Sequence, residues 1–280
     1  MSRSTRVRHR RLKRSLRTVR LVTWNVNSLK VRGPRVLELL AEHRPDVVCL
    51  QETKTEPAAF PTEDLARAGY GAAHHSGGRW AGVAILAREK LTIEEVRAGL
   101  PGEARADQAR WIEATVGGLR VASVYVVNGQ AVGSEPWAEK LRFLHAMAER
   151  LAELRSQQLV VMGDFNIAPH DVDVYDPGAF AGSTHVTPEE RAALADLSTA
   201  GALVDAYRAL YPVGGEDPNR THHTWWDYRQ GHFHRGLGLR IDLALLSEPL
   251  VPRLVRAGIE RDYRKGTKPS DHAPLVVDLA

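Results

Sequence analysis

The feature that most constrains how this chain can fold is the alternation of strand-sized apolar runs with longer amphipathic segments. The longest apolar runs, such as VVCL at 47–50 and VASVYVV at 121–127, have the length of β-strands and not the roughly 18–20 residues of a membrane span. Between such runs, apolar residues recur with helical spacing, most clearly over 135–155. The pattern predicts one domain of the α/β (α+β) class, with two packed sheets and helices outside them.

The expected helices and strands follow from spacing and from end signals. We expect a second helix over 34–43, with its proline near the start, and a third that opens with the capping pattern beginning at Thr187. Segments 167–187 and 211–238 are expected to be loops. The expected strands are 19–25, 46–51, 80–87, 111–116, 118–127, 158–166, 240–247 and 273–279.

Charge is distributed unevenly along the chain. The net charge is +4, but residues 1–20 hold nine Lys and Arg and no acid, which leaves 29 cations against 34 anions elsewhere. We expect this basic tail, residues 1–20, to be disordered. It would either bind phosphates without sequence preference or be dispensable. Residues 21–280 are expected to form a single catalytic domain.

Cys49 is the single cysteine and lies inside an apolar run. One cysteine excludes an intrachain disulfide and every multi-cysteine zinc pattern. The N-terminus has cations but lacks the apolar region of a secretory signal. We therefore expect a reduced, cytoplasmic protein that does not enter a membrane, and a monomer, since the sequence holds no dimerisation signal.

Polar side chains gather where the expected strands begin or end. A single Asp or Asn in such a place is usually a turn or cap residue. Here, however, six clusters occupy such places, and strands that share one edge of a sheet would bring them into one cleft, where chemistry usually lies. The clusters are Asn25 and Asn27, Glu52 and Lys54, Tyr125 and Asn128, Asp164 and Asn166, Asp242, and Asp271 with His272.

These residue types favour cleavage of a phosphoester. Glu52 and Asn25, with Asp271, offer hard oxygen ligands of the kind that hold Mg²⁺ together with water and substrate phosphate. Asp164 can orient or deprotonate a water. The charged imidazole of His272 can stabilise negative charge on a phosphoryl oxygen.

Neighbouring side chains complete this interpretation. Asp242 and Asp271 can orient the imidazole and keep it charged, and Asn166 and Tyr125 can donate hydrogen bonds to the phosphate. The sequence contains no P-loop, no GxSxG motif and no HExxH motif, which argues against the chemistries that depend on them.

The motifs that carry these residues resemble the exonuclease III family of apurinic/apyrimidinic endonucleases, within the endonuclease/exonuclease/phosphatase superfamily. The resemblance extends from about Arg20 to Ala280. GDFN and SDH are shared across the superfamily, whereas QETK, WWDYR and RGLGLRID are typical of the bacterial exonuclease III branch. The motifs are WNVN, LQETK, VYVVNG, GDFN, HTWWDYR, RGLGLRIDLAL and SDHAP.

The resemblance implies a four-layer α/β sandwich of two facing mixed sheets flanked by helices. It implies Mg²⁺-dependent cleavage of duplex DNA 5′ to abasic sites in base excision repair, leaving a 3′-hydroxyl, with Mn²⁺ as a possible substitute. It also implies 3′-phosphatase and 3′→5′ exonuclease activity on duplex DNA, with abasic sites or blocked 3′ ends in the DNA partner. By position, Glu52 with Asn25 corresponds to the metal site and Asp164 to the group that activates water. Asp242 would orient His272, and Asp271 would support either the metal or the histidine network.

The resemblance also implies how DNA is held. Trp225, Leu239 and Ile241 are expected to line a narrow apolar pocket for an abasic sugar. Arg240 and Lys54 are expected to contact backbone phosphates, and Asn27 and Asn128 are expected beside the substrate.

Two positions depart from the family pattern, and two other functions remain open. Ser28 replaces a glycine, and Val127 replaces a proline; neither change touches the expected chemistry. A phosphoesterase acting on a small molecule or lipid headgroup would share the superfamily's core motifs. A DNA-binding module without catalysis would share the fold but would not need the acidic set.

Overall fold

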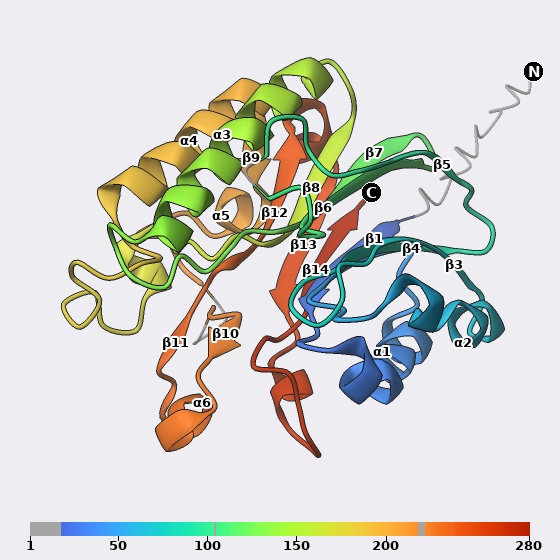
Figure 1. Ribbon diagram of the computed structural model, residues 1–280, viewed down its shortest axis with the longest axis horizontal. Coiled ribbons are helices and arrows are strands. Elements are labelled where there is room, and N and C mark those ends of the chain that lie inside the picture. Colours follow the sequence, from blue (N-terminus) through green and yellow to red (C-terminus); the bar gives the residue numbers. More distant parts are fainter. Residues whose placement is uncertain (1–17, 104, 218–221) are drawn as a thin grey trace, which may run out of the picture.

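Two facing six-stranded sheets form the centre of the molecule in the computed structural model, which describes residues 18–103, 105–217 and 222–280. Helices cover the outer face of each sheet (Figure 1). The result is the expected four-layer α/β sandwich. In the described ranges, no helix combines the length and the apolar character needed to cross a membrane.

The first sheet has the strand order β13-β14-β1-β2-β4-β3. Its strands β1 and β2 are parallel, and its other neighbours are antiparallel. Its strands, in chain order, are β1 (Val19–Asn25), β2 (Val47–Gln51), β3 (Tyr70–His75), β4 (Val83–Arg88), β13 (Leu254–Ile259) and β14 (Leu275–Leu279).

The second sheet has the order β5-β6-β7-β8-β12-β9. Only β7 and β8 are parallel among its paired neighbours. A separate two-stranded ribbon pairs β10 (Trp225–Trp226) with β11 (Gly238–Leu239). The strands of the second sheet are β5 (Ile93–Ala98), β6 (Trp111–Val116), β7 (Leu119–Tyr125), β8 (Leu159–Asp164), β9 (Leu203–Asp205) and β12 (Asp242–Ser247).

The helices complete the outer layers. Apolar residues of α1 (Leu29–His43) and α2 (Thr62–Arg67) pack on the first sheet, and those of α3 (Glu135–Leu154) and α4 (Pro188–Gly201) pack on the second. A third apolar core lies between the two sheets. Two short helices, α5 (Ala206–Leu210) and α6 (His232–Arg235), follow α4, and a 3₁₀ turn over Pro57–Ala59 precedes α2.

Several boundaries differ from the sequence-based prediction. The helix expected over 34–43 begins at Leu29, so that Pro34 lies inside α1. Its extra turn is anchored by backbone N–H groups of Ser28 and Leu29, which donate to the carbonyls of Glu52 and Thr53. Sequence periodicity cannot reveal such a tertiary anchor. The prediction also omitted β3, β5, β9, β13 and the helices α2, α5 and α6.

The expected basic tail and the expected first strand overlap at residues 19 and 20, and the structure assigns both residues to the strand. Val19 and Arg20 belong to β1, and the Arg20 guanidinium pairs with Asp278 on β14 at 2.8 Å. Residues 1–17 of the predicted basic tail lie outside the described residues.

Candidate active site

One rim of the sandwich collects the polar side chains that follow or precede the central strands. β1 ends at Asn25 and β8 ends at Asp164, while β12 begins at Asp242, directly opposite Asp164 in the sheet register. His272 precedes β14, which runs antiparallel to β1. Strand direction alone therefore brings residues from both sheets to the same edge, as expected from the sequence.

Three side chains at this rim form a potential metal centre. Glu52, Asp164 and His272 each offer a ligand atom, and these atoms lie within 4.8 Å of one another. The amide nitrogen of Asn25 joins two of the three, donating to Glu52 Oε1 at 2.7 Å and to Asp164 Oδ2 at 2.9 Å. Asn25 thus fixes a carboxylate of each sheet in place.

His272 and Asp242 form a buried pair. His272 Nδ1 lies 2.8 Å from Asp242 Oδ2, which turns Nε2 toward Asp164 Oδ2 at 3.7 Å. Burial alone would lower the pKa of His272, but the carboxylates of Asp242 and Asp164 outweigh it and raise the pKa to about 10. The imidazole is therefore cationic at neutral pH, as the sequence predicted.

Asp164 experiences an excess of negative charge. Burial raises its pKa, as do the carboxylates of Asp242 and Glu52, and against the opposing charge of His272 the pKa reaches about 7. A bound cation would relieve this crowding. The cationic imidazole of His272 has no free lone pair and would not be a ligand. The carboxylate oxygens of Glu52 and Asp164 suit a divalent ion, and the ammonium of Lys54 already lies 2.7 Å from Glu52 Oε2. The residues present therefore fit a metal ion.

Three further predicted residues lie beside this centre. Asn166 donates from its backbone N–H to Asp164 Oδ1 at 2.9 Å and from its side chain to the carbonyl of Val126. Asn128 reaches Asn166 Oδ1 at 3.5 Å. Burial and the charge of Glu52 raise the pKa of Tyr125 well above its usual range, so the phenol stays protonated and can donate.

The two other predicted metal ligands, Asn25 and Asp271, lie beside the group of three and make hydrogen bonds there. The side-chain oxygen Oδ1 of Asn25 accepts a hydrogen bond from the backbone N–H of Asn27. Its side-chain nitrogen Nδ2 faces the carboxylates of Glu52 and Asp164. Asp271 lies outside the group of three, and its oxygens accept from Asn27 Nδ2 at 2.9 Å and Trp225 Nε1 at 3.1 Å. Burial opposes ionisation of Asp271, yet His272 and these hydrogen bonds lower its pKa.

The predicted DNA-contacting residues separate into exposed and buried ones. Arg240 is only 1% exposed and pairs with Asp173 and Asp205, each at 2.7 Å, so the prediction that it contacts phosphates is wrong. Leu239 and Ile241 are also buried, in an apolar cluster against which the half-buried Trp225 packs. Of this predicted pocket, Trp225 alone presents surface.

Sequence reasoning missed a buried network behind the rim. Lys140 Nζ donates to the backbone carbonyl of Asn166 at 2.7 Å and pairs with Glu190, and both side chains are fully buried. His185 Nδ1 lies 2.6 Å from the same carbonyl. One signal was available: Lys140 interrupts the apolar stripe of its helix, three residues after Trp137 and four before Leu144.

Comparisons with known proteins agree with this geometry. The model of the Endonuclease/Exonuclease/phosphatase family matches residues 22–272. Exodeoxyribonuclease III of Haemophilus influenzae is 32% identical over 93% of this chain and 100% of that protein. The 3′ phosphatase NExo from Neisseria, solved with a product DNA hairpin, is 37% identical with a TM-score of 0.87, covering 94% of this chain and 99% of that one. An AP endonuclease from Archaeoglobus fulgidus is 33% identical with a TM-score of 0.86, covering 93% and 99%.

Proposed function

Because the chain belongs to the Endonuclease/Exonuclease/phosphatase family and is similar to exodeoxyribonuclease III over nearly its whole length, we propose that it is a DNA-repair hydrolase. It cleaves phosphoester bonds of duplex DNA at blocked 3′ ends and 5′ to abasic sites. The observation that carries the proposal is the approach of Asp164 to the charged His272–Asp242 pair beside Glu52. We further expect a cytoplasmic monomer.

Glu52 is the proposed protein ligand of Mg²⁺, with Mn²⁺ as a possible substitute, and the carboxylate of Asp164 could share the ion, since its oxygen lies within 4.8 Å of that of Glu52. When bound, the ion would neutralise charge on the phosphate and polarise its oxygens. Asn25 would hold the carboxylates of Glu52 and Asp164 close together for that role through its two hydrogen bonds.

The chain's own groups would divide the remaining work. Asp164, as a carboxylate, would orient the attacking water and accept its proton. His272, kept cationic by Asp242, would stabilise the negative charge that grows on the phosphoryl oxygen. Tyr125 and Asn166 would donate hydrogen bonds to the scissile phosphate.

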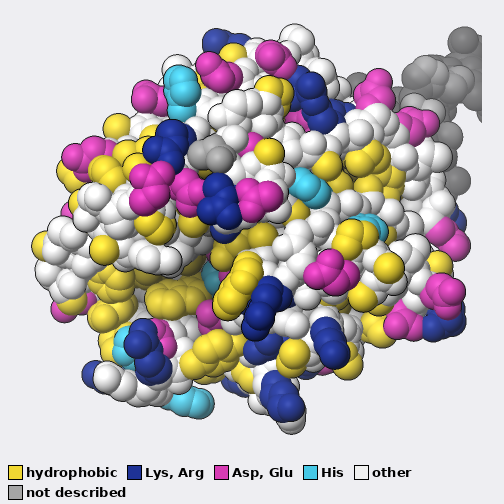
Figure 2. Space-filling view, in the orientation of Figure 1, with side chains coloured by type: hydrophobic (Ala, Val, Ile, Leu, Met, Phe, Trp, Pro, Cys, Tyr) yellow, Lys and Arg dark blue, Asp and Glu magenta, His cyan; other side chains and the backbone are white. Residues whose placement is uncertain are grey.

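The closed apolar cluster favours 3′ ends as the first substrate to test. Leu239 and Ile241 are buried and Trp225 packs against them, so the cluster leaves no open pocket for a sugar. A phosphate at a 3′ end would reach the rim without needing such a pocket. Incision at an abasic site needs that cluster to open. Figure 2 shows a hollow on this face with cationic and apolar side chains along its rim, a surface suited to a DNA backbone.

A panel of four substrates tests the proposal. They are a nicked duplex with a 3′-phosphate, a duplex with one abasic analogue, an undamaged blunt duplex and an inositol phosphate, each with Mg²⁺ and with EDTA. We expect Mg²⁺-dependent turnover of the first two. Asp164→Asn should lower turnover by about 10²–10⁴-fold, whereas the matched control Asp196→Asn, exposed on α4, should not change it.

Either of two results would overturn the proposal. Turnover of inositol phosphate alone would indicate the small-molecule phosphoesterase. Duplex binding without turnover of any substrate would indicate a binding module.

A further inference from the structure

The ammonium of Lys54 forms an ion pair with Glu52, the proposed metal ligand. Its Nζ lies 2.7 Å from Glu52 Oε2 and 2.7 Å from Asn27 Oδ1. The other oxygen of the Glu52 carboxylate accepts from Asn25 at 2.7 Å. Both oxygens of Glu52 are therefore occupied, one by an uncharged amide and one by an ammonium.

The ammonium and a metal ion would compete for the same carboxylate. Glu52 and Lys54 are both largely buried, with side chains 14% and 23% exposed, so their attraction is screened less than that of a surface pair. A divalent ion that binds Glu52 must displace Nζ from Oε2 or accept a like charge beside it. Either outcome weakens metal binding.

The backbone of Lys54 is held by hydrogen bonds, so a change of partner would involve its side chain. The backbone N–H groups of Thr53 and Lys54 donate to the carbonyls of Gly82 and Ala81, at 3.1 and 2.9 Å. These bonds tie the loop after β2 to the start of β4. The backbone around Glu52 thus stays fixed when the lysine changes partner.

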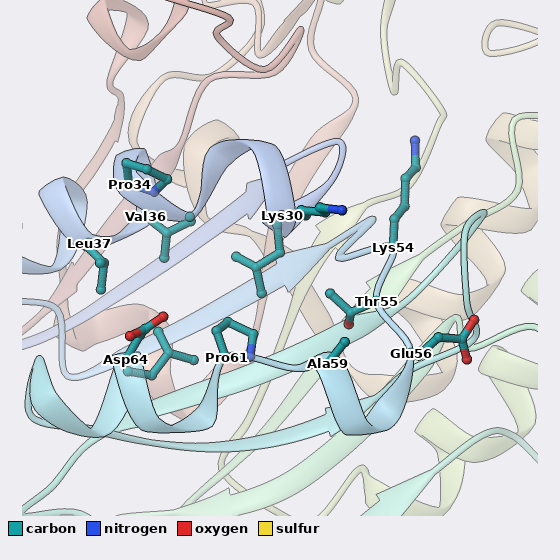
Figure 3. Close-up of a pocket in the computed structure, with 13 residues that line it drawn as sticks. Lys30, Pro34, Val36, Leu37, Lys54, Thr55, Glu56, Ala59, Pro61 and Asp64 are labelled. Carbon is teal, nitrogen blue, oxygen red and sulfur yellow. The ribbon is translucent and has the colours of Figure 1, made fainter.

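The surroundings of Lys54 give its side chain room to turn. A cavity of about 510 Å³ lies between α1 and the segment from the loop after β2 to α2, and Lys54 is among its lining residues. Figure 3 shows Lys54 rising from the rim of this cavity with its nitrogen pointing away from it, while Pro61 and Val36 line the apolar walls. The stem of Lys54 therefore borders open space on the cavity side.

We propose that Lys54 is an internal counter-ion that couples metal binding to DNA binding. In the free protein it neutralises Glu52; a DNA phosphate at the rim draws the ammonium away, and the vacated carboxylate then binds the metal more tightly. This inference rests on the proposed function. By thermodynamic linkage, the metal must tighten DNA binding by the same factor.

Titration calorimetry of Mg²⁺ tests the coupling in a binding measurement. Affinity is measured for the full chain alone and with saturating product duplex that ends in a 3′-hydroxyl and carries phosphorothioate linkages at that end, which block exonuclease turnover. The variants are Lys54→Met and Lys54→Gln. The matched control is Lys30→Met, because Lys30 lines the same cavity from α1 and is exposed to solvent.

The expected results are specific to Lys54. Without DNA, both Lys54 variants should bind Mg²⁺ about tenfold more tightly than the wild type. The factor by which product duplex tightens Mg²⁺ binding should be about tenfold smaller in the Lys54 variants than in the wild type. Lys30→Met should match the wild type in both respects.

Three outcomes separate the possibilities. The inference is overturned if, without DNA, both Lys54 variants bind Mg²⁺ no more tightly than the wild type. It is also overturned if product duplex tightens Mg²⁺ binding by the same factor in the variants as in the wild type. Failure of the wild type to bind either Mg²⁺ or the duplex would instead contradict the proposed function. If one of the two Lys54 variants has an altered melting temperature, the comparison uses the other variant.

Discussion

Replacing Lys140 by methionine should lower the free energy of unfolding by about 3 kcal/mol. Lys140 lies on α3 and Glu190 on α4, and both side chains are fully buried where the two helices pack. Methionine fills a similar volume, so the change removes the charge without opening a large cavity. The carboxylate of Glu190 would then remain buried without its cation.

The magnitude follows from the contacts that remain. Breaking a buried ion pair from one side costs about 3–5 kcal/mol. We expect the lower end, because the Glu190 carboxylate still accepts from the Thr184 hydroxyl at 2.7 Å and the Thr187 hydroxyl at 2.8 Å. In a chain of this size the loss corresponds to a fall in melting temperature of about 6–12 °C.

Urea denaturation followed by circular dichroism measures the effect. The double variant Lys140→Met/Glu190→Gln should recover a large part of the loss, because it removes both charges and Gln still fits the capping box at Thr187. Arg142→Met, exposed on the same helix, should change stability by less than about 0.5 kcal/mol. A loss below about 1 kcal/mol for Lys140→Met, or a double variant that loses the sum of both single losses, would refute the reasoning.

Four further predictions concern other parts of the molecule. Asp164→Asn and His272→Ala should each lower turnover by about 10²–10⁴-fold while duplex binding survives; near-wild-type turnover of either would refute the assigned role. Ser28→Gly should stabilise the fold by about 1 kcal/mol, because Ser28 has a φ of 100° that glycine adopts without strain, and a lower melting temperature would contradict this. Burial lowers the pKa of His223 from 6.5 to about 4, so unfolding takes up a proton between these values and stability falls as pH drops through that window. His223→Gln should remove on the order of 3 kcal/mol of that fall, and an unchanged pH profile would count against it. Deleting residues 1–17 should reduce the salt dependence of DNA binding but not the rate at saturating DNA; an unchanged salt slope would mean that the segment does not contact DNA.

The position of the catalytic rim could be predicted from the sequence because polar strand ends are local signals and the family motifs that contain them indicate that they belong to one site. Asp164 ends one apolar run and Asp242 begins another, and antiparallel pairing sets them opposite each other. His272 precedes the last strand for the same reason. These placements need only the strand assignments and the rule that neighbouring strands share an edge.

What the sequence could not reveal is the choice among distant partners. Arg240 was expected on the surface, but it pairs with Asp173 and Asp205, which lie 67 and 35 residues away in the chain. The same holds for Lys140 and Glu190, separated by 50 residues. The local sequence pattern does not indicate which buried charged residues form ion pairs, because the packing of helices and sheets in the folded protein determines the partners.

The most direct test of the central claim is the Mg²⁺ dependence of 3′-phosphate hydrolysis on a nicked duplex, measured in single turnover for the wild type and for Glu52→Gln. The account predicts no hydrolysis in EDTA, saturation of the wild type with Mg²⁺, and a Mg²⁺ requirement at least about tenfold higher in Glu52→Gln, with unchanged duplex affinity. Hydrolysis in EDTA, or the same Mg²⁺ dependence in both proteins, would contradict the assignment of the Glu52, Asp164 and His272 centre.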